Sequence, residues 1–86
     1  MESKDKVKIL RKFTDLCILC EEPGLMVNLT YFTSSSGITF TVTGEKYGEP
    51  LIQTRIYLDV FSFEKADQIF NETLQECITH FRHPIV

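Results

Sequence analysis

The sequence lacks any hydrophobic run long enough to cross a bilayer, and it lacks the apolar segment that would mark a signal peptide. Residues 1–6 are mostly charged or polar and lead directly into an amphipathic pattern. Cysteine is scarce and odd in number, with three residues, which fits reduced thiols better than a disulfide framework. We therefore expect a cytoplasmic protein that does not enter the membrane.

Catalytic sequence signatures are also missing. The chain has no phosphate-binding loop, dinucleotide fingerprint, serine-hydrolase elbow or zinc-protease helix motif. His80 and His83, close to Glu76, could form an acid–base group, but no nucleophile accompanies them. Cations are favoured at a helix C-terminus, so these histidines are better interpreted as a helix end. The sequence predicts a protein that is not an enzyme and needs no cofactor.

Basic residues are scarce outside the first twelve positions. Residues 1–12 hold five basic and two acidic side chains, a net charge of +3, whereas residues 13–86 hold four basic and ten acidic ones and sum to −6. An acidic body repels nucleic-acid phosphates and attracts basic proteins. The charge distribution therefore favours a protein partner with a basic surface.

What the sequence does contain begins with an amphipathic helical pattern. Apolar side chains recur at i, i+4 and i+7 spacing over residues 6–21, which predicts a helix. Ser3 or Asp5 can cap its first turn. Pro23 cannot continue the helical hydrogen bonds and Gly24 accepts a left-handed turn, so the helix should stop before them.

A second helix is predicted over residues 63–81, where another apolar stripe follows helical spacing. Ser62 is a good N-cap, and Pro84 lies beyond the expected C-terminus. Acidic residues fall near the start of this segment, where the helix dipole favours negative charge.

Three short runs between the helices alternate apolar and polar residues. They cover residues 25–32, 38–43 and 51–58, and turn-forming segments at 33–37 and 44–50 separate them. Such alternation predicts antiparallel strands joined by hairpins, with one apolar and one threonine-rich face.

The predicted fold is an α+β two-layer sandwich in the order α-β-β-β-α. Its sheet is a three-stranded antiparallel meander, and both helices cover one face because two amphipathic helices and a one-sided sheet each need an apolar partner. Short connections reverse the chain at each element, so the two helices should run in the same direction. Residues 1–86 form a single domain in this interpretation. The residues expected on the covered face are Val27, Leu29, Phe40, Val42, Ile56 and Leu58.

Four residues could form a zinc site. Cys17 and Cys20 form a C-x-x-C pair, and Cys77 and His80 repeat the same spacing on the second predicted helix. A Cys₃His set is an accepted structural zinc site. Apolar residues fill the C-x-x-C pair, however, and free cysteine is among the most buried residue types. We therefore predict core thiols and no metal.

The element order is similar to that of the double-stranded-RNA-binding domain. That family presents a lysine cluster at the start of its second helix, where this sequence has Lys65 between Glu64 and Asp67. Binding phosphates across a groove needs several cations. The resemblance therefore extends to the order of helices and strands and does not include the RNA-binding lysines. The segment that could still bind nucleic acid is the basic stretch from Lys4 to Lys12.

The threonine-rich face is the candidate binding surface, because nothing in the predicted fold covers it. Aromatic residues and arginine are enriched at protein interfaces. Two acidic loop residues, Glu45 and Glu49, join this surface in the prediction. The candidate site residues are Asn28, Thr30, Phe32, Thr39, Thr41, Thr43, Gln53, Arg55, Tyr57, Glu45 and Glu49.

In its short length, acidity and lack of motifs, the chain resembles small α+β accessory proteins of phage and mobile elements. That resemblance implies a non-enzymatic interaction module, such as an inhibitor that occupies a basic channel of its target. Phosphate mimicry would use five carboxylates: Glu45, Glu49, Asp59, Glu64 and Asp67. The alternative is nucleic-acid binding through the basic N-terminal helix. Either edge strand also offers a route to a homodimer.

Overall fold

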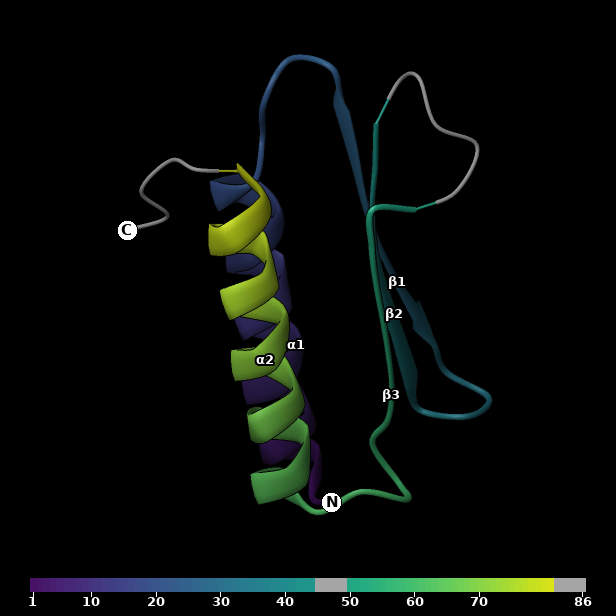
Figure 1. The fold of residues 1–86 in the computed structure, drawn as a ribbon. Coiled ribbons are helices and arrows are strands. Elements are labelled where there is room, and N and C mark those ends of the chain that lie inside the picture. The colour runs from purple at the N-terminus through teal and green to yellow at the C-terminus, as the bar shows by residue number, and fades with distance from the viewer. Residues whose placement is uncertain (45–49, 82–86) are drawn as a thin grey trace.

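The computed structural model describes residues 1–44 and 50–81. Figure 1 shows two helices lying side by side over one face of a three-stranded sheet. The predicted α+β sandwich with the order α-β-β-β-α is therefore confirmed. The elements are α1 (Ser3–Leu19), β1 (Leu25–Phe32), β2 (Gly37–Gly44), β3 (Ile52–Tyr57) and α2 (Phe63–Phe81).

The first helix begins three residues earlier than predicted. Glu2 is the N-cap residue, with extended backbone and no side-chain capping bond. Its carbonyl oxygen accepts hydrogen bonds from the N–H groups of Asp5 and Lys6, both at 3.0 Å. The prediction that Ser3 or Asp5 caps the helix is wrong, because main-chain bonds alone start it. Asp5 lies instead in the first turn, where its negative charge interacts favourably with the positive end of the helix dipole.

The same helix ends at Leu19, two residues before its predicted end. The N–H of Cys20 still donates to the carbonyl oxygen of Leu16 at 2.9 Å, so the last turn closes at the C-cap. Gly24 then adopts a φ of 88°, in the left-handed region that glycine occupies without strain. The chain can therefore reverse within a few residues and enter β1.

The sheet is an antiparallel meander in the order β1-β2-β3, as predicted. Phe40, in the middle of β2, lies opposite Leu29 of β1 and opposite Thr54 of β3. The first strand has the predicted bounds. The second is one residue longer at each end, and the third is one residue shorter at each end. Most of the predicted second hairpin loop, 44–50, lies outside the described residues.

The second helix has the predicted bounds. The Oγ atom of Ser62 accepts a hydrogen bond from the N–H of Lys65 at 3.1 Å, which confirms the predicted N-cap. Both helices run in the same direction, with their C-terminal ends at the same end of the sandwich (Figure 1). Within residues 1–44 and 50–81, neither helix combines the length and the hydropathy that a bilayer span requires.

The core lies between the helices and the covered face of the sheet. Three phenylalanines join its three parts, because the ring of Phe13 on α1 lies 5.6 Å from that of Phe40 and 5.0 Å, edge-on, from that of Phe70. The buried apolar residues are Ile9, Phe13, Leu16, Cys20, Ile38, Phe40, Val42, Ile52, Ile56, Leu58, Ala66 and Cys77. Val27 and Leu29 also face this side but are only half-buried.

One hydrogen-bonded pair of hydroxyl groups joins the covered face to α2. The Oγ1 atoms of Thr54 and Thr73 are 2.7 Å apart, and the Thr73 hydroxyl donates to the carbonyl oxygen of Ile69 at 2.9 Å. Thr54 is therefore the donor to Thr73. Because both hydroxyls are satisfied, they can lie inside the sandwich without the cost of an unpaired polar group.

A lysine ties the start of α1 to two distant connections. The Nζ atom of Lys6 lies 2.7 Å from Oδ1 of Asp59 and donates to Oγ of Ser36 at 3.1 Å. The hydrogen bond to Asp59 raises the pKa of Lys6, and the pKa of Asp59 is lowered mainly by the same bond and then by Ser36. Ser36 is buried and has a φ of 48°. This contact fixes the first hairpin against the β3–α2 connection.

Candidate functional site

The uncovered face of the sheet carries all nine predicted site residues that belong to strands. Register places them in rows across the strands, so that Asn28, Thr41 and Gln53 form one row. Thr30, Thr39 and Arg55 form the next row. Side chains on alternate residues of a strand point to the same face, so the whole set shares one surface. The strand residues brought together are Asn28, Thr30, Phe32, Thr39, Thr41, Thr43, Gln53, Arg55 and Tyr57. Below, we call them the open face.

One end of the open face is aromatic. Phe32 and Tyr57 lie on either side of Gly37 in register, and their exposed fractions are 49% and 40%. A Cβ on Gly37 would lie 3.6 Å from Cδ1 of Tyr57, so the tyrosine ring lies beside this glycine. Gly37 is consequently buried although it faces the open side. Phe32, Gly37 and Tyr57 therefore form a small apolar patch at the end of the sheet next to the β1–β2 hairpin.

Two contributors to this surface were missed by sequence reasoning. Met26, at the opposite end of β1, is 64% exposed and lies opposite Thr43. Its position in the alternating pattern could have identified it. Gly37 was assigned to a turn, and only the cross-strand register shows that it lies between two aromatic residues.

The open face is almost free of charge, because Arg55 is its one ionisable side chain apart from Tyr57. The predicted acidic members, Glu45 and Glu49, lie outside the described residues. Of the other carboxylates predicted to mimic phosphate, Asp59 pairs with Lys6 and Asp67 with Lys12, while Glu64 is exposed.

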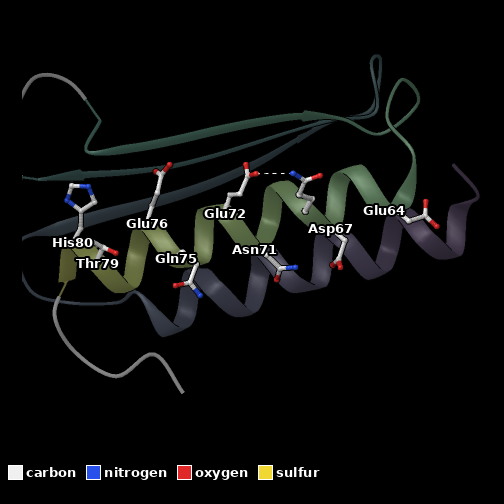
Figure 2. Close-up of a pocket in the computed structure, with 9 residues that line it drawn as sticks. Glu64, Asp67, Asn71, Glu72, Gln75, Glu76, Thr79 and His80 are labelled. Carbon is white, nitrogen blue, oxygen red and sulfur yellow. Dashed lines mark hydrogen bonds between the residues drawn. The ribbon is translucent and has the colours of Figure 1, made fainter.

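The acidic surface lies instead along α2. A shallow groove of about 660 Å³ follows the outer side of this helix. Figure 2 shows Glu72 and Glu76 pointing toward the sheet side and Asp67 toward α1, and Glu72 accepts a hydrogen bond from Gln68 at 3.2 Å. Glu64, Gln68, Glu72 and Glu76 follow one another at intervals of four residues, and this pattern in the sequence could have revealed the row. The groove is lined by Glu64, Asp67, Gln68, Asn71, Glu72, Gln75, Glu76, Thr79 and His80.

The basic helix keeps most of its cations close to carboxylates. Lys6 pairs with Asp59, as described above. Lys12 pairs with Asp67 and lies 5.6 Å above the ring of Phe70. Two further pairs lie within the helix's first turns, Lys4–Glu2 at 3.6 Å and Lys8–Asp5 at 3.9 Å. Cations that already neighbour carboxylates attract phosphates less strongly, so the nucleic-acid alternative gains nothing from this arrangement.

The cysteines lie in the core, as predicted, near the C-terminal ends of the two helices. Cys20 and Cys77 are fully buried and lie close to each other, and Cys17 is half-buried. Burial is the main reason that the pKa of each of the three thiols is raised, and proximity to Cys20 also raises that of Cys77. Across the described ranges, no group of three or more His, Cys, Asp or Glu side chains has an arrangement that could hold a metal ion.

Taken together, the geometry offers one sheet face whose charged side chain is Arg55 and which has an aromatic end, and, on the opposite layer, one acidic helix. Comparison with family models, with curated proteins and with solved structures found no match to this chain.

Proposed function

We propose that this protein is a small, non-enzymatic interaction module that binds another protein through the open face of its sheet. The observation that carries the proposal is a complete sheet face left uncovered by the helices, with Phe32 and Tyr57 exposed at one end. Aromatic side chains that can be buried on contact supply much of the energy of protein interfaces. The surrounding threonines and Gln53 can hydrogen-bond to a partner.

The partner we propose is basic. The net charge of the chain is −3, and Glu64, Asp67, Glu72 and Glu76 form an acidic row along the α2 groove. Figure 2 shows Glu72 and Glu76 on the sheet side of α2, so a partner extending over the β3 edge from the open face would reach them. Opposite charges across an interface accelerate association and exclude acidic competitors.

The biological setting is part of the same proposal. Short length, net acidity and the lack of catalytic signatures support a cytoplasmic accessory protein or inhibitor, of the type encoded by phage and mobile elements. The three cysteines are free thiols, which fits a reducing compartment.

The test is affinity capture with a matched pair of variants. Phe32→Ser with Tyr57→Ser removes the aromatic end, whereas Val60→Ser with Ile78→Ser removes two exposed apolar side chains elsewhere. We expect the wild type and the Val60/Ile78 variant to retain the same partner and the Phe32/Tyr57 variant to lose it. Binding should weaken as salt rises, because charges contribute to it. Equal capture by both variants would contradict the proposal, and salt-independent binding would remove the basic partner.

A further inference from the structure

The two edges of the sheet differ in how they are protected. Natural proteins block edge strands with charge, proline, bulges or short length, because free backbone groups pair with other strands. The β3 edge is six residues long, contains Arg55, and has the carbonyl of Tyr57 occupied by the N–H groups of Val60 and Phe61. By contrast, β1 has eight residues, all paired to β2 without a bulge, and it contains no charged residue, proline or glycine.

The backbone groups that β1 turns outward can be identified from the register. The N–H of Leu58 donates to the carbonyl of Ser36, so the even-numbered residues of β2 turn toward β3 and its odd-numbered residues toward β1. The partners of those odd residues on β1 are even-numbered. Val27, Leu29 and Tyr31 therefore direct their N–H and C=O groups away from the sheet.

Space for a further layer lies beside α1. The inward side chains of β1 are less buried than those of the neighbouring strand: Tyr31 is 37% exposed and Val27 and Leu29 are partly exposed, whereas Ile38, Phe40 and Val42 are fully buried. The space between α1 and β1 is thus only partly filled by side chains. Two hollows follow the flank of α1 along β1, one of about 250 Å³ beside Tyr31 and one of about 460 Å³ beside Val27.

We infer that β1 is a self-association edge, at which two copies of this chain pair antiparallel to form one continuous six-stranded sheet. A twofold axis through Leu29 pairs Leu29 with itself and Val27 with Tyr31 of the second copy. All three outward-facing residues of each copy are then hydrogen-bonded. An axis at Asn28 would instead pair Tyr31 with Leu25, whose N–H already donates to Glu22.

Side-chain chemistry favours the same register. On the open face it places Met26, which is 64% exposed, opposite Phe32 of the second copy. These residues fall in a pair without hydrogen bonds between them, where side chains approach most closely. A methionine sulfur beside an aromatic ring is a favourable contact. The two exposed apolar ends of β1 therefore cover each other.

Charge identifies a second copy as the occupant. An antiparallel arrangement places the first half of α1 beside the second half of its symmetry mate. Residues 1–12 carry a net charge of +3, and they keep a positive excess after Lys6 and Lys12 are paired with Asp59 and Asp67. Residues 13–24 carry three acidic side chains and no basic one, a net charge of −3. The twofold axis thus brings opposite charges together twice, while the strands between them are neutral. The inference rests on the backbone edge of β1 and shares Phe32 alone with the aromatic end of the open face.

The experiment measures the solution mass of the full chain by light scattering from low to high micromolar concentration. Leu29→Lys places two like charges on the twofold axis, and Gln53→Lys is the matched change at the β3 edge. We expect twice the 10.0 kDa chain mass for the wild type and Gln53→Lys, and the single-chain mass for Leu29→Lys, with circular dichroism confirming its fold. A monomeric wild type, or a dimer that survives Leu29→Lys, would overturn the inference.

Cross-linking tests the register without relying on Leu29→Lys to fold. In a Cys17→Ser background, Leu29→Cys should form an intermolecular disulfide under mild oxidation, because a hydrogen-bonded pair is about 5.5 Å apart between Cα atoms. Thr30→Cys, which would face Asn28 of the second copy, should form far less. Equal cross-linking of both, or none of Leu29→Cys, would overturn the twofold axis through Leu29.

Discussion

The two faces of the sheet share three strands and differ in almost everything else. Along β2, Ile38, Phe40 and Val42 are fully buried under the helices, while Thr39 and Thr41 between them remain partly exposed. The difference shows that one strand can serve stability and recognition at once, because successive side chains point to opposite sides. Burial constrains the covered face, whereas the open face is free to carry a binding surface.

The largest expected effect tests the covered face. Phe40→Ala removes a fully buried ring that lies next to Phe13, and should lower the free energy of unfolding by about 3–5 kcal/mol, through lost burial and the cavity left behind. Urea denaturation measures it, with the milder Phe40→Leu for use if the alanine variant does not fold. A loss below about 1 kcal/mol would mean that the covered face is not the main source of stability.

Alkaline pH offers a second test of the covered face. Burial raises the pKa of Cys77 above its ordinary value of 9.0, so the folded chain keeps a proton that the unfolded chain loses. Stability should be constant with respect to this thiol below pH 9.0 and then fall as pH rises, by up to about 1.4 kcal/mol per pH unit. Denaturation at about pH 8 and about pH 10 checks this. Cys77→Ala should show a shallower decline, and an unchanged slope would contradict the assignment.

Removing one threonine hydroxyl from each face of the sheet compares how much the two faces contribute to stability. Thr54→Val removes the hydrogen bond to Thr73 at the boundary with α2 and should cost about 1 kcal/mol. Thr39→Val makes the same chemical change on the open face and should alter stability by less than about 0.5 kcal/mol. The difference between the two unfolding free energies is the measurement. Equal costs would show that the Thr54 contact contributes nothing beyond its position in a strand.

The smallest expected effect is on the open face. Thr41→Ala should change the free energy of unfolding by less than about 0.5 kcal/mol, because the hydroxyl meets solvent and no described hydrogen bond depends on it. Thermal unfolding at low protein concentration is the measurement. A cost above about 1.5 kcal/mol would break the comparison by showing that something covers this face.

Sequence patterns predicted the sheet and α2 better than the start of α1. Alternation over β2 identified Ile38, Phe40 and Val42 as inward residues, because a strand has only two faces. The predicted start of α1 was wrong because Glu2 caps the helix with its main-chain carbonyl group and makes no side-chain capping bond. Preferences for capping side chains cannot predict such a start.

Contacts between distant segments could not be predicted in the same way. Lys6 is 30 residues from Ser36 and 53 from Asp59, and nothing local to it indicates either partner. The aromatic end of the open face depends on Gly37 lying between Phe32 and Tyr57, which is a property of register. The nine strand residues of the candidate site were correctly placed on one face, since alternation fixes them once the covered face is known.

The amino-acid pattern by itself determined the order of elements and the side of each strand that is buried, because hydrophobic periodicity matches backbone geometry. Only the tertiary structure decided that the space between α1 and β1 is partly open and that the acidic groove follows α2. Both outcomes depend on where the two helices pack across the three-stranded sheet. Helix positions over the sheet depend on contacts among all the elements at once, so no local sequence pattern in a single segment predicts them.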